Sequence, residues 1–227
     1  MPVFELIDKI LFPDVRFAEE DGLIAIGGDL SIPRLLAAYS QGIFPWYSRG
    51  QPILWWSPDP RFILFPDKFH LPESMNRKIR KNIFEIRIDE QFDKVISRCA
   101  STRRKGESGT WITAEMKRAY IDLFTAGFAH SFESYYEGKL AGGLYGISIG
   151  KAFFGESMFH TMTDASKAAL YLLVKTVQKK GFLFIDAQME TKHLSSLGAE
   201  QISRDEYILL LDKALTYPTW KGKWEQL

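Results

Sequence analysis

The sequence predicts an α+β fold with a central, mostly antiparallel sheet. Three observations support this: two apolar-rich strands, 130–136 and 139–147, flank a turn at 137–138; a strand over 152–159 precedes a long amphipathic helix over 164–179; and a short apolar strand, 182–186, follows that helix. A run of antiparallel strands, then a helix and a buried strand, is typical of a helix layer packed on a central sheet.

The first 62 residues are predicted to form a small, loop-rich N-terminal domain, and residues 63–227 a larger second domain. Ser31 as N-cap and Pro33 in the first turn predict a helix, which Gly42 ends. The segment 53–56 is predicted to be a strand. It stops at the following prolines, because a proline has no N–H to donate to a sheet ladder.

Between the N-terminal domain and the long helix, the pattern is mixed α/β. Residues 84–88 alternate as a half-buried strand does, and Asp89 is expected to cap the helix that follows. Thr113 is expected to cap the next helix, which Gly127 closes. Two further helices are predicted over 190–197 and 205–215.

The composition excludes several classes of protein. An apolar fraction of 46% and an aromatic fraction of 14% exclude a disordered chain. Apolar runs such as 168–174 are too short to span a bilayer, and the N-terminus lacks a secretory pattern. The single cysteine, Cys99, falls at helical spacing among apolar residues, so we expect it in the core. We therefore expect a cytoplasmic protein with no membrane association.

Positive charge is concentrated in one part of the chain. Residues 61–105 carry twelve Lys and Arg against six Asp and Glu, although the whole chain has a net charge of only +1. The excess lies in two clusters, Arg77, Lys78, Arg80, Lys81 and Arg103, Arg104, Lys105. Solvated surfaces and contacts to a phosphate backbone explain such clusters about equally well.

The usual signatures of cofactor chemistry are missing from the sequence. There is no phosphate-binding glycine loop, and the four histidines lack metal-ligand spacing. We therefore expect neither a metal nor a cofactor. The notable features are aromatic: Trp46 and Trp111 lie beside chain breakers and could stack on a base, whereas Trp55 and Trp56 are expected to pack in the core.

Two segments place polar side chains among large apolar ones. Glu156 and Ser157 lie within the segment 155–159, and Asp186 and Gln188 follow the apolar run 182–185, on one face if the strand continues. A buried aspartate must accept hydrogen bonds or face a site. Local sequence leaves a helix-capping role for Asp186 equally open.

Together, these segments resemble those of the bacterial leucyl/phenylalanyl-tRNA–protein transferases. The resemblance runs from about residue 20 to 200 and rests on GGDL at 27–30, GIFPW at 42–46, WWSPDPR at 55–61, GTWIT at 109–113, GESMF at 155–159, ASK at 165–167, DAQ at 186–188 and SLGA at 196–199. It implies a C-terminal domain similar to the GNAT acyltransferases. It also implies transfer of leucine or phenylalanine from charged tRNA to an N-terminal Arg or Lys of a protein, which marks that protein for degradation.

The resemblance also implies roles for individual residues. Asp186 and Gln188 would form a relay in which Asp186 polarises the side chain of Gln188. Glu156 would anchor either the terminal adenosine or the cationic acceptor. Trp46 and Trp111 would contact the adenosine. No free cofactor is implied, because the ester to tRNA already activates the acyl group.

The departures from the family concern the side-chain pocket. Leu144, Leu173 and Val177 stand where relatives carry Met and Phe, while Ser157 and Met158 remain. The pocket stays apolar, so the preference among Leu, Phe and Met is left open, and Leu173 and Val177 are also ordinary core candidates. Thr191 replaces an Asn of the family.

Two other functions fit parts of this pattern. One is an RNA-binding module without catalysis, which would not need Asp186 and Gln188. The other is a small-molecule acyltransferase that uses an acyl thioester. Such enzymes usually have a glycine-rich pyrophosphate loop before a helix, and the sequence contains no such loop.

Overall fold

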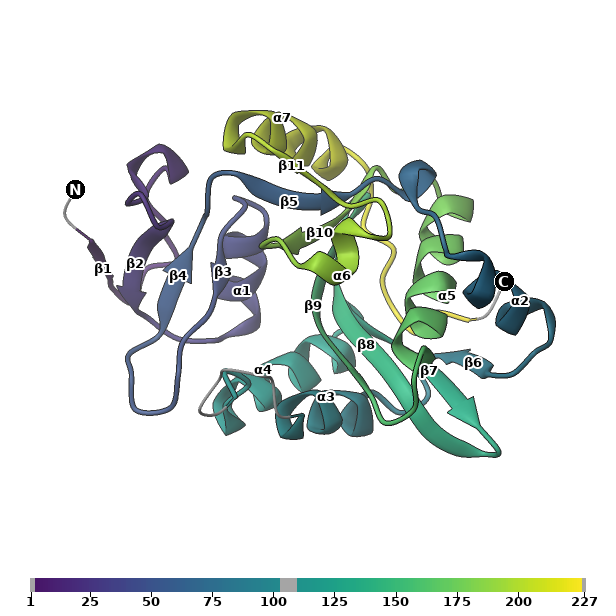
Figure 1. Cartoon of the computed structure of the whole chain (residues 1–227). Coiled ribbons are helices and arrows are strands. Elements are labelled where there is room, and N and C mark those ends of the chain that lie inside the picture. Colours follow the sequence, from purple (N-terminus) through teal and green to yellow (C-terminus); the bar gives the residue numbers. More distant parts are fainter. Residues whose placement is uncertain (1–2, 103–109, 226–227) are drawn as a thin grey trace.

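Two sheets of unequal size form the frame of the protein (Figure 1). The computed structural model describes residues 3–102 and 110–225. In that part of the chain, no helix combines the length and apolar character needed to cross a membrane.

The smaller sheet has the strand order β1-β2-β4-β3 and belongs to the N-terminal domain. Its elements are β1 (Phe4–Leu6), β2 (Leu23–Gly27), β3 (Phe44–Pro45) and β4 (Leu54–Trp56), with a 3-10 turn, η1 (Val15–Phe17), and helix α1 (Ile32–Tyr39). Ser31 and Pro33 begin α1 as predicted. Helix α1 buries Leu35, Ala38 and Tyr39.

The larger sheet has the order β11-β5-β10-β9-β8-β7-β6. Its strands are β5 (Arg61–Leu64), β6 (Glu85–Ile88), β7 (Ala129–Tyr136), β8 (Lys139–Ile149), β9 (Ala152–His160), β10 (Phe184–Gln188) and β11 (Glu200–Ile202). Every neighbouring pair is antiparallel except β9 and β10. The predicted α+β class with a mostly antiparallel sheet is confirmed. Strand β5 already begins at Arg61, so the two sheets divide within residues 57–60, and the predicted boundary at residue 62 falls inside this strand.

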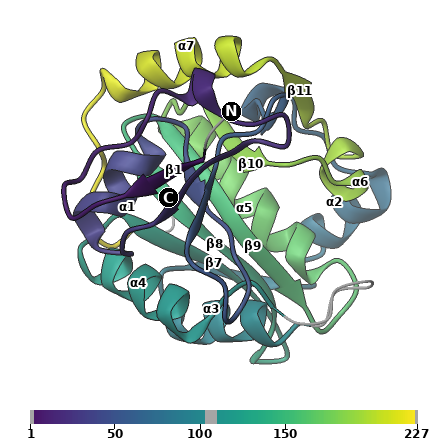
Figure 2. The same cartoon turned by 90° about the vertical axis from the view of Figure 1, so that its left-hand side faces the viewer.

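Helices cover both faces of this sheet. They are α2 (Glu73–Arg80), α3 (Phe92–Ser101), α4 (Ala114–Thr125), α5 (Ala165–Lys179), α6 (Lys192–Ser195) and α7 (Arg204–Leu215), with the 3-10 turn η2 (Pro66–Lys68). Figure 2 shows α3 and α4 on one side of β7 to β9 and α5 on the other. Cys99 is buried in α3, as its spacing predicted.

The prediction that Asp89 caps a helix was wrong. The N-cap of α3 is Gln91, while Asp89 is buried and accepts hydrogen bonds from Ser131, His130 and the main chain of Trp224. Local sequence could not reveal this, because the partners lie 41 to 135 residues further along the chain. Helix α2 and strands β5 and β11 were not predicted either.

The site depends on how β9 and β10 separate. The two parallel strands pair over Phe184↔Ala152 to Asp186↔Phe154, after which β9 runs on to His160 and β10 ends at Gln188. The register of β10 against β5 shifts between Asp186 and Gln188, and Gln188 has a φ of 58°. The diverging strands therefore leave an opening at the centre of the protein, where ligands commonly bind.

Candidate active site

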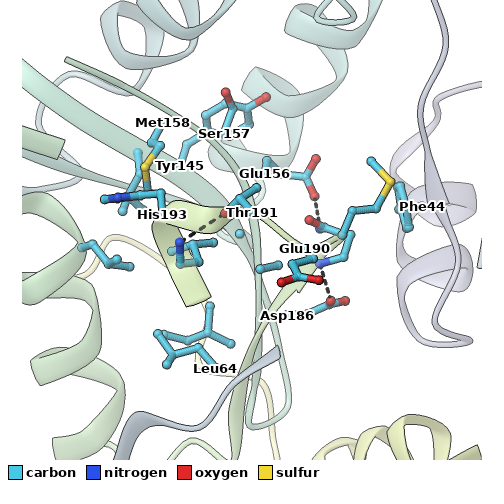
Figure 3. A pocket seen from close by; sticks show the side chains of 18 of the residues that line it. Phe44, Leu64, Tyr145, Glu156, Ser157, Met158, Asp186, Glu190, Thr191 and His193 are labelled. Carbon is cyan, nitrogen blue, oxygen red and sulfur yellow. Dashed lines mark hydrogen bonds between the residues drawn. The ribbon is translucent and has the colours of Figure 1, made fainter. Parts of the chain in front are cut away.

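A cavity of about 440 Å³ occupies this opening, within the size range of small-ligand sites (Figure 3). Residues from both domains line it: Phe44, Pro45, Trp46, Leu64, Trp111, Leu144, Tyr145, Gly155, Glu156, Ser157, Met158, Leu170, Leu173, Ile185, Asp186, Ala187, Gln188, Met189, Glu190, Thr191, His193 and Leu194. Nine residues expected in the site thus come together here: Trp46, Trp111, Leu144, Glu156, Ser157, Met158, Leu173, Asp186 and Gln188.

Apolar and polar side chains occupy different parts of the cavity wall. In Figure 3, Met158 and Leu64 lie to the left of Glu156 and Asp186. Leu144 from β8 and Leu173 from α5 add to the apolar lining. Val177 does not belong to this lining: it is fully buried in the core one turn further along α5, so its expected place in the pocket is corrected.

The two tryptophans lie at the cavity from different domains. Trp46 follows β3 and is 37% exposed, and its ring meets Trp56 edge to face at 5.8 Å. Trp56 donates from Nε1 to the carbonyl of Trp46 at 2.7 Å, which holds the main chain there. Trp111 is half-buried just before α4. Trp55 is fully buried, as predicted, whereas Trp56 is only half-buried.

Glu156 is half-buried and held by hydroxyl groups from two helices. Tyr39 of α1 donates to Oε1 at 2.6 Å, and Tyr120 of α4 donates to Oε2 at 2.9 Å. The two hydroxyl oxygens also lie 2.5 Å apart; each hydroxyl has one proton, so while both donate to Glu156 neither donates to the other. Gln188 donates from Nε2 to Oε1 at 3.4 Å.

The pKa of Glu156 is shifted into the neutral range. Burial raises this pKa to about 7, although the hydrogen bonds from Tyr39 and Tyr120 favour the ionised form. The negative charge of Asp186 raises it further, and the positive charge of Arg61 lowers it. Glu156 can therefore gain or lose a proton at physiological pH.

Asp186 is the anionic half of a buried ion pair. Arg61 donates from Nε to Oδ1 at 2.9 Å and from Nη2 to Oδ2 at 2.6 Å, and both side chains are buried. Tyr207 donates to Oδ2 at 2.8 Å. Arg61 also donates to the carbonyl of Gly42 at 3.1 Å, and its guanidinium lies over the rings of Phe44 and Tyr207.

Gln188 meets Asp186 through the main chain. Its backbone N–H donates to Oδ1 of Asp186 at 2.9 Å, which supports the positive φ at this bulge. Its side-chain amide points to Glu156 instead. The contact expected between Asp186 and the side chain of Gln188 is thus replaced by one from Gln188 to Glu156.

Thr191 determines where the next helix begins. It is the N-cap of α6, and its side chain accepts from the N–H of Leu194 at 3.2 Å. The short helix then places His193 and Leu194 in the cavity lining. The alternative that Asp186 caps this helix was wrong.

The basic cluster at 77–81 lies on and just after α2, away from the described cavity lining. Lys78 is paired with Asp164 at 2.8 Å, and Arg80 with Glu73. Arg77 and Lys81 are exposed and have no ionic partner among the described residues. Arg103, Arg104 and Lys105 lie outside the described residues.

Sequence reasoning missed four site residues: Tyr39, Tyr120, Arg61 and Tyr207. Tyr39 and Tyr120 fall at helical spacing among apolar residues, a pattern that by itself indicates core packing. A possible signal was the hydroxyl group, because a buried tyrosine usually has a hydrogen-bond partner. Arg61 stood in a recognised segment without a role. Within residues 3–102 and 110–225, no group of three or more His, Cys, Asp or Glu could hold a metal ion.

Two family models match the chain. Residues 63–212 match the model described as leucyl/phenylalanyl-tRNA protein transferase, and residues 28–59 match the one for its N-terminal domain. Curated relatives with that name are similar over almost the whole chain. The protein of Desulfatibacillum aliphaticivorans is 51% identical over 99% of this chain and 96% of its own, and that of Myxococcus xanthus (strain DK1622) is 50% identical over 100% and 97%.

Likeness to solved structures is distant. L-PGS from Bacillus licheniformis is 11% identical with a TM-score of 0.39, covering 88% of this chain and 66% of that one. An aminoglycoside acetyltransferase from a soil metagenomic sample is 14% identical with a TM-score of 0.34, covering 59% and 88%. The family matches and the full-length identity carry the assignment. The chain is an aminoacyltransferase and belongs to the leucyl/phenylalanyl-tRNA protein transferase family.

Proposed function

We propose that the protein transfers leucine or phenylalanine, with methionine as a third donor residue, from tRNA to an N-terminal Arg or Lys of acceptor proteins in the cytoplasm. The added residue would serve as a degradation signal. The supporting observation is the cavity between β9 and β10, which is apolar on one part of its wall and carries Glu156 and Gln188 on another.

The apolar lining fits the side chain of the donor residue. Leu144, Met158 and Leu173 present methyl, methylene and thioether groups to the cavity. An apolar side chain entering this space leaves water favourably. A charged side chain would exchange its hydration for these groups at a cost of several kcal/mol or more.

The rest of the donor would lie at the tryptophans and along α2. We propose that Trp46 and Trp111 hold the terminal adenosine, because aromatic faces stack on any base. Arg77 and Lys81, which have no ionic partner among the described residues, would contact phosphates of the tRNA without reading its sequence. We propose the same for Lys78 and Arg80, which would exchange their present carboxylate partners, and for Arg103, Arg104 and Lys105.

The charge of the cavity fits a cationic acceptor. Asp186 is balanced by Arg61, whereas Glu190 accepts, among the described residues, only from the neutral groups of Ser195 and Gln201. Together with Glu156, Glu190 gives the cavity wall an excess of carboxylate. An N-terminal Arg or Lys carries two positive charges that such a wall attracts. We propose that Gln188 orients the α-amine of this residue toward the ester.

Labelled leucyl-tRNA incubated with short peptides tests the proposal. Label should pass to peptides that begin with Arg or Lys, and not to a matched peptide that begins with Glu or to an N-acetylated Arg peptide. Alanyl-tRNA serves as the donor control. Binding of leucyl-tRNA without transfer would support the RNA-binding alternative, and equal transfer to the Glu peptide would refute acceptor selection by charge.

A further inference from the structure

We propose that the carboxylate of Glu156, gripped by Tyr39 and Tyr120, takes the proton that the acceptor amine releases, and that Asp186 has no part in proton transfer. This inference rests on the proposed function. It also makes Tyr39 and Tyr120 positioning residues, so that the N-terminal domain supplies part of the acid–base machinery.

Asp186 has no free capacity to accept a proton. A carboxylate offers about four acceptor positions. On Asp186 these receive Nε and Nη2 of Arg61, the hydroxyl of Tyr207 and the backbone N–H of Gln188. Protonation would displace one of these donors and leave the Arg61 guanidinium without its counter-charge inside the protein. The role that the structure supports for Asp186 is to hold the bulge that carries Gln188.

Glu156 differs from Asp186 in each of these respects. It is half-buried at the cavity wall, whereas Asp186 is fully buried. Two tyrosine hydroxyls and the long contact from Gln188 leave part of its acceptor capacity free. Gln188 touches Glu156, so an amine oriented by the amide of Gln188 lies next to this carboxylate.

The groups around Glu156 bring its pKa close to that of the acceptor amine. The groups that face it are Tyr39 on α1, Tyr120 on α4, Asp186 on β10 and Arg61 on β5. Their combined effect with burial gives Glu156 a pKa of about 7. An N-terminal amine has a pKa of about 7.7–8.0, so the base and the amine are closely matched. Burial raises the pKa of both tyrosines well above 10, which makes them donors rather than bases.

The proposed transfer step conserves atoms and protons. The amine nitrogen forms a bond to the ester carbonyl carbon, and the bond from that carbon to the 3′ oxygen of the adenosine breaks. The nitrogen loses one proton to Glu156, and Glu156 then gives this proton to the departing 3′ oxygen. The products are an amide and a free 3′ hydroxyl, and Glu156 returns to its ionised form.

A pH profile of Glu156→Gln tests the assignment. Single-turnover transfer from leucyl-tRNA to an Arg peptide is measured from about pH 5.5 to 8.5 for the wild type and the variant, and the ratio of their rates is plotted. Ionisation of the acceptor amine changes the rate of both proteins by the same factor, so it cancels in this ratio. We expect the ratio to rise about tenfold per pH unit below pH 7 and then to level off, with a plateau of roughly 10²–10⁴.

Glu133→Gln is the matched control. Among the described residues, Glu133 is a second glutamate whose pKa burial raises to about 7, but it is fully buried on β7, outside the described cavity lining. The wild-type to Glu133→Gln ratio should stay flat with pH. A flat ratio for Glu156→Gln as well would overturn the proposal, while wild-type transfer to the peptide would still leave the proposed function intact.

Tyr120→Phe gives a second readout that a purely structural role would not change. Losing this hydrogen bond removes a group that favours ionised Glu156, so the pKa of Glu156 should rise. The pH at which the transfer rate of Tyr120→Phe stops rising should therefore be higher than in the wild type. A uniform loss of rate at every pH, with no such movement, would overturn the role of the tyrosines.

Discussion

Arg61→Met should unfold the protein at a much lower temperature than the wild type. Methionine keeps much of the length of the side chain but leaves the Asp186 carboxylate buried without a counter-charge. Removing one partner of a buried ion pair costs about 3–5 kcal/mol. For a chain of 227 residues, each kcal/mol lowers the Tm by about 2–4 °C, so the expected shift is about 6–20 °C.

Thermal unfolding followed by circular dichroism measures this shift, and the double variant with Asp186→Asn shows its cause. The double variant has neither charge, so no unpaired charge remains. Its loss in unfolding free energy should therefore be smaller than the sum of the two single losses by roughly 1–3 kcal/mol. Arg80→Met is the control, because Arg80 and Glu73 form an exposed pair worth about 0–1 kcal/mol.

Two results would refute this reasoning. One is an Arg61→Met protein that melts within about 3 °C of the wild type, which would mean that the pair contributes about 1 kcal/mol or less. The other is strict additivity in the double variant, which would mean that Arg61 and Asp186 act on stability independently despite their two hydrogen bonds.

Four further outcomes are expected. Leu173→Phe should fill part of the apolar lining and lower transfer of phenylalanine relative to leucine by about tenfold or more, measured as the kcat/KM ratio for the two charged tRNAs; an unchanged ratio would place Leu173 outside the side-chain site. The double variant Arg77→Ala, Lys81→Ala should bind leucyl- and phenylalanyl-tRNA equally less tightly, and the slope of log K against log salt concentration should fall by about 2, while transfer from a minimal aminoacyl-adenosine stays unchanged. Equal losses with whole tRNA and with aminoacyl-adenosine would contradict phosphate contact. Trp111→Ala should weaken the binding of both whole charged tRNA and aminoacyl-adenosine by about 1–3 kcal/mol, and a loss limited to whole tRNA would exclude stacking on the terminal adenosine. The pKa of Glu133 is 4.5 in the unfolded chain and about 7 in the folded protein, so between these values the folded state binds the proton more tightly and the free energy of unfolding should fall as pH rises. In urea titrations at several pH values, Glu133→Gln should lose this part of the pH dependence; an unchanged pH dependence would exclude a contribution from Glu133.

The local signals in the sequence were sufficient for the larger elements. Alternation predicted β6, apolar-rich runs predicted β7 to β10, and 3.6-residue patterns predicted the helices α1, α3, α4, α5 and α7, because these patterns depend only on which residues of an element are buried. Helix α2 was missed, since Met75 is the only side chain it fully buries and its remaining residues carry little apolar periodicity. Strand β5 was missed because it has only four residues, Arg61–Leu64, and directly follows the prolines that were expected to end the preceding strand.

For the site, the sequence determined which residue types were present, and the tertiary structure decided which of them met. Asp186, Gln188 and Glu156 could be singled out because polar side chains among large apolar ones need partners. Their partners could not be named: Arg61 lies 125 residues from Asp186, and Tyr39 lies 117 residues from Glu156. Periodicity shows that a side chain is buried, but a hydrogen bond also requires direction and distance, which exist only in the folded structure. Folding of the larger domain brings Tyr120 to Glu156 and pairs Arg61 with Asp186, and the packing of the N-terminal domain adds Tyr39. These contacts decide which of two similar carboxylates can carry a proton.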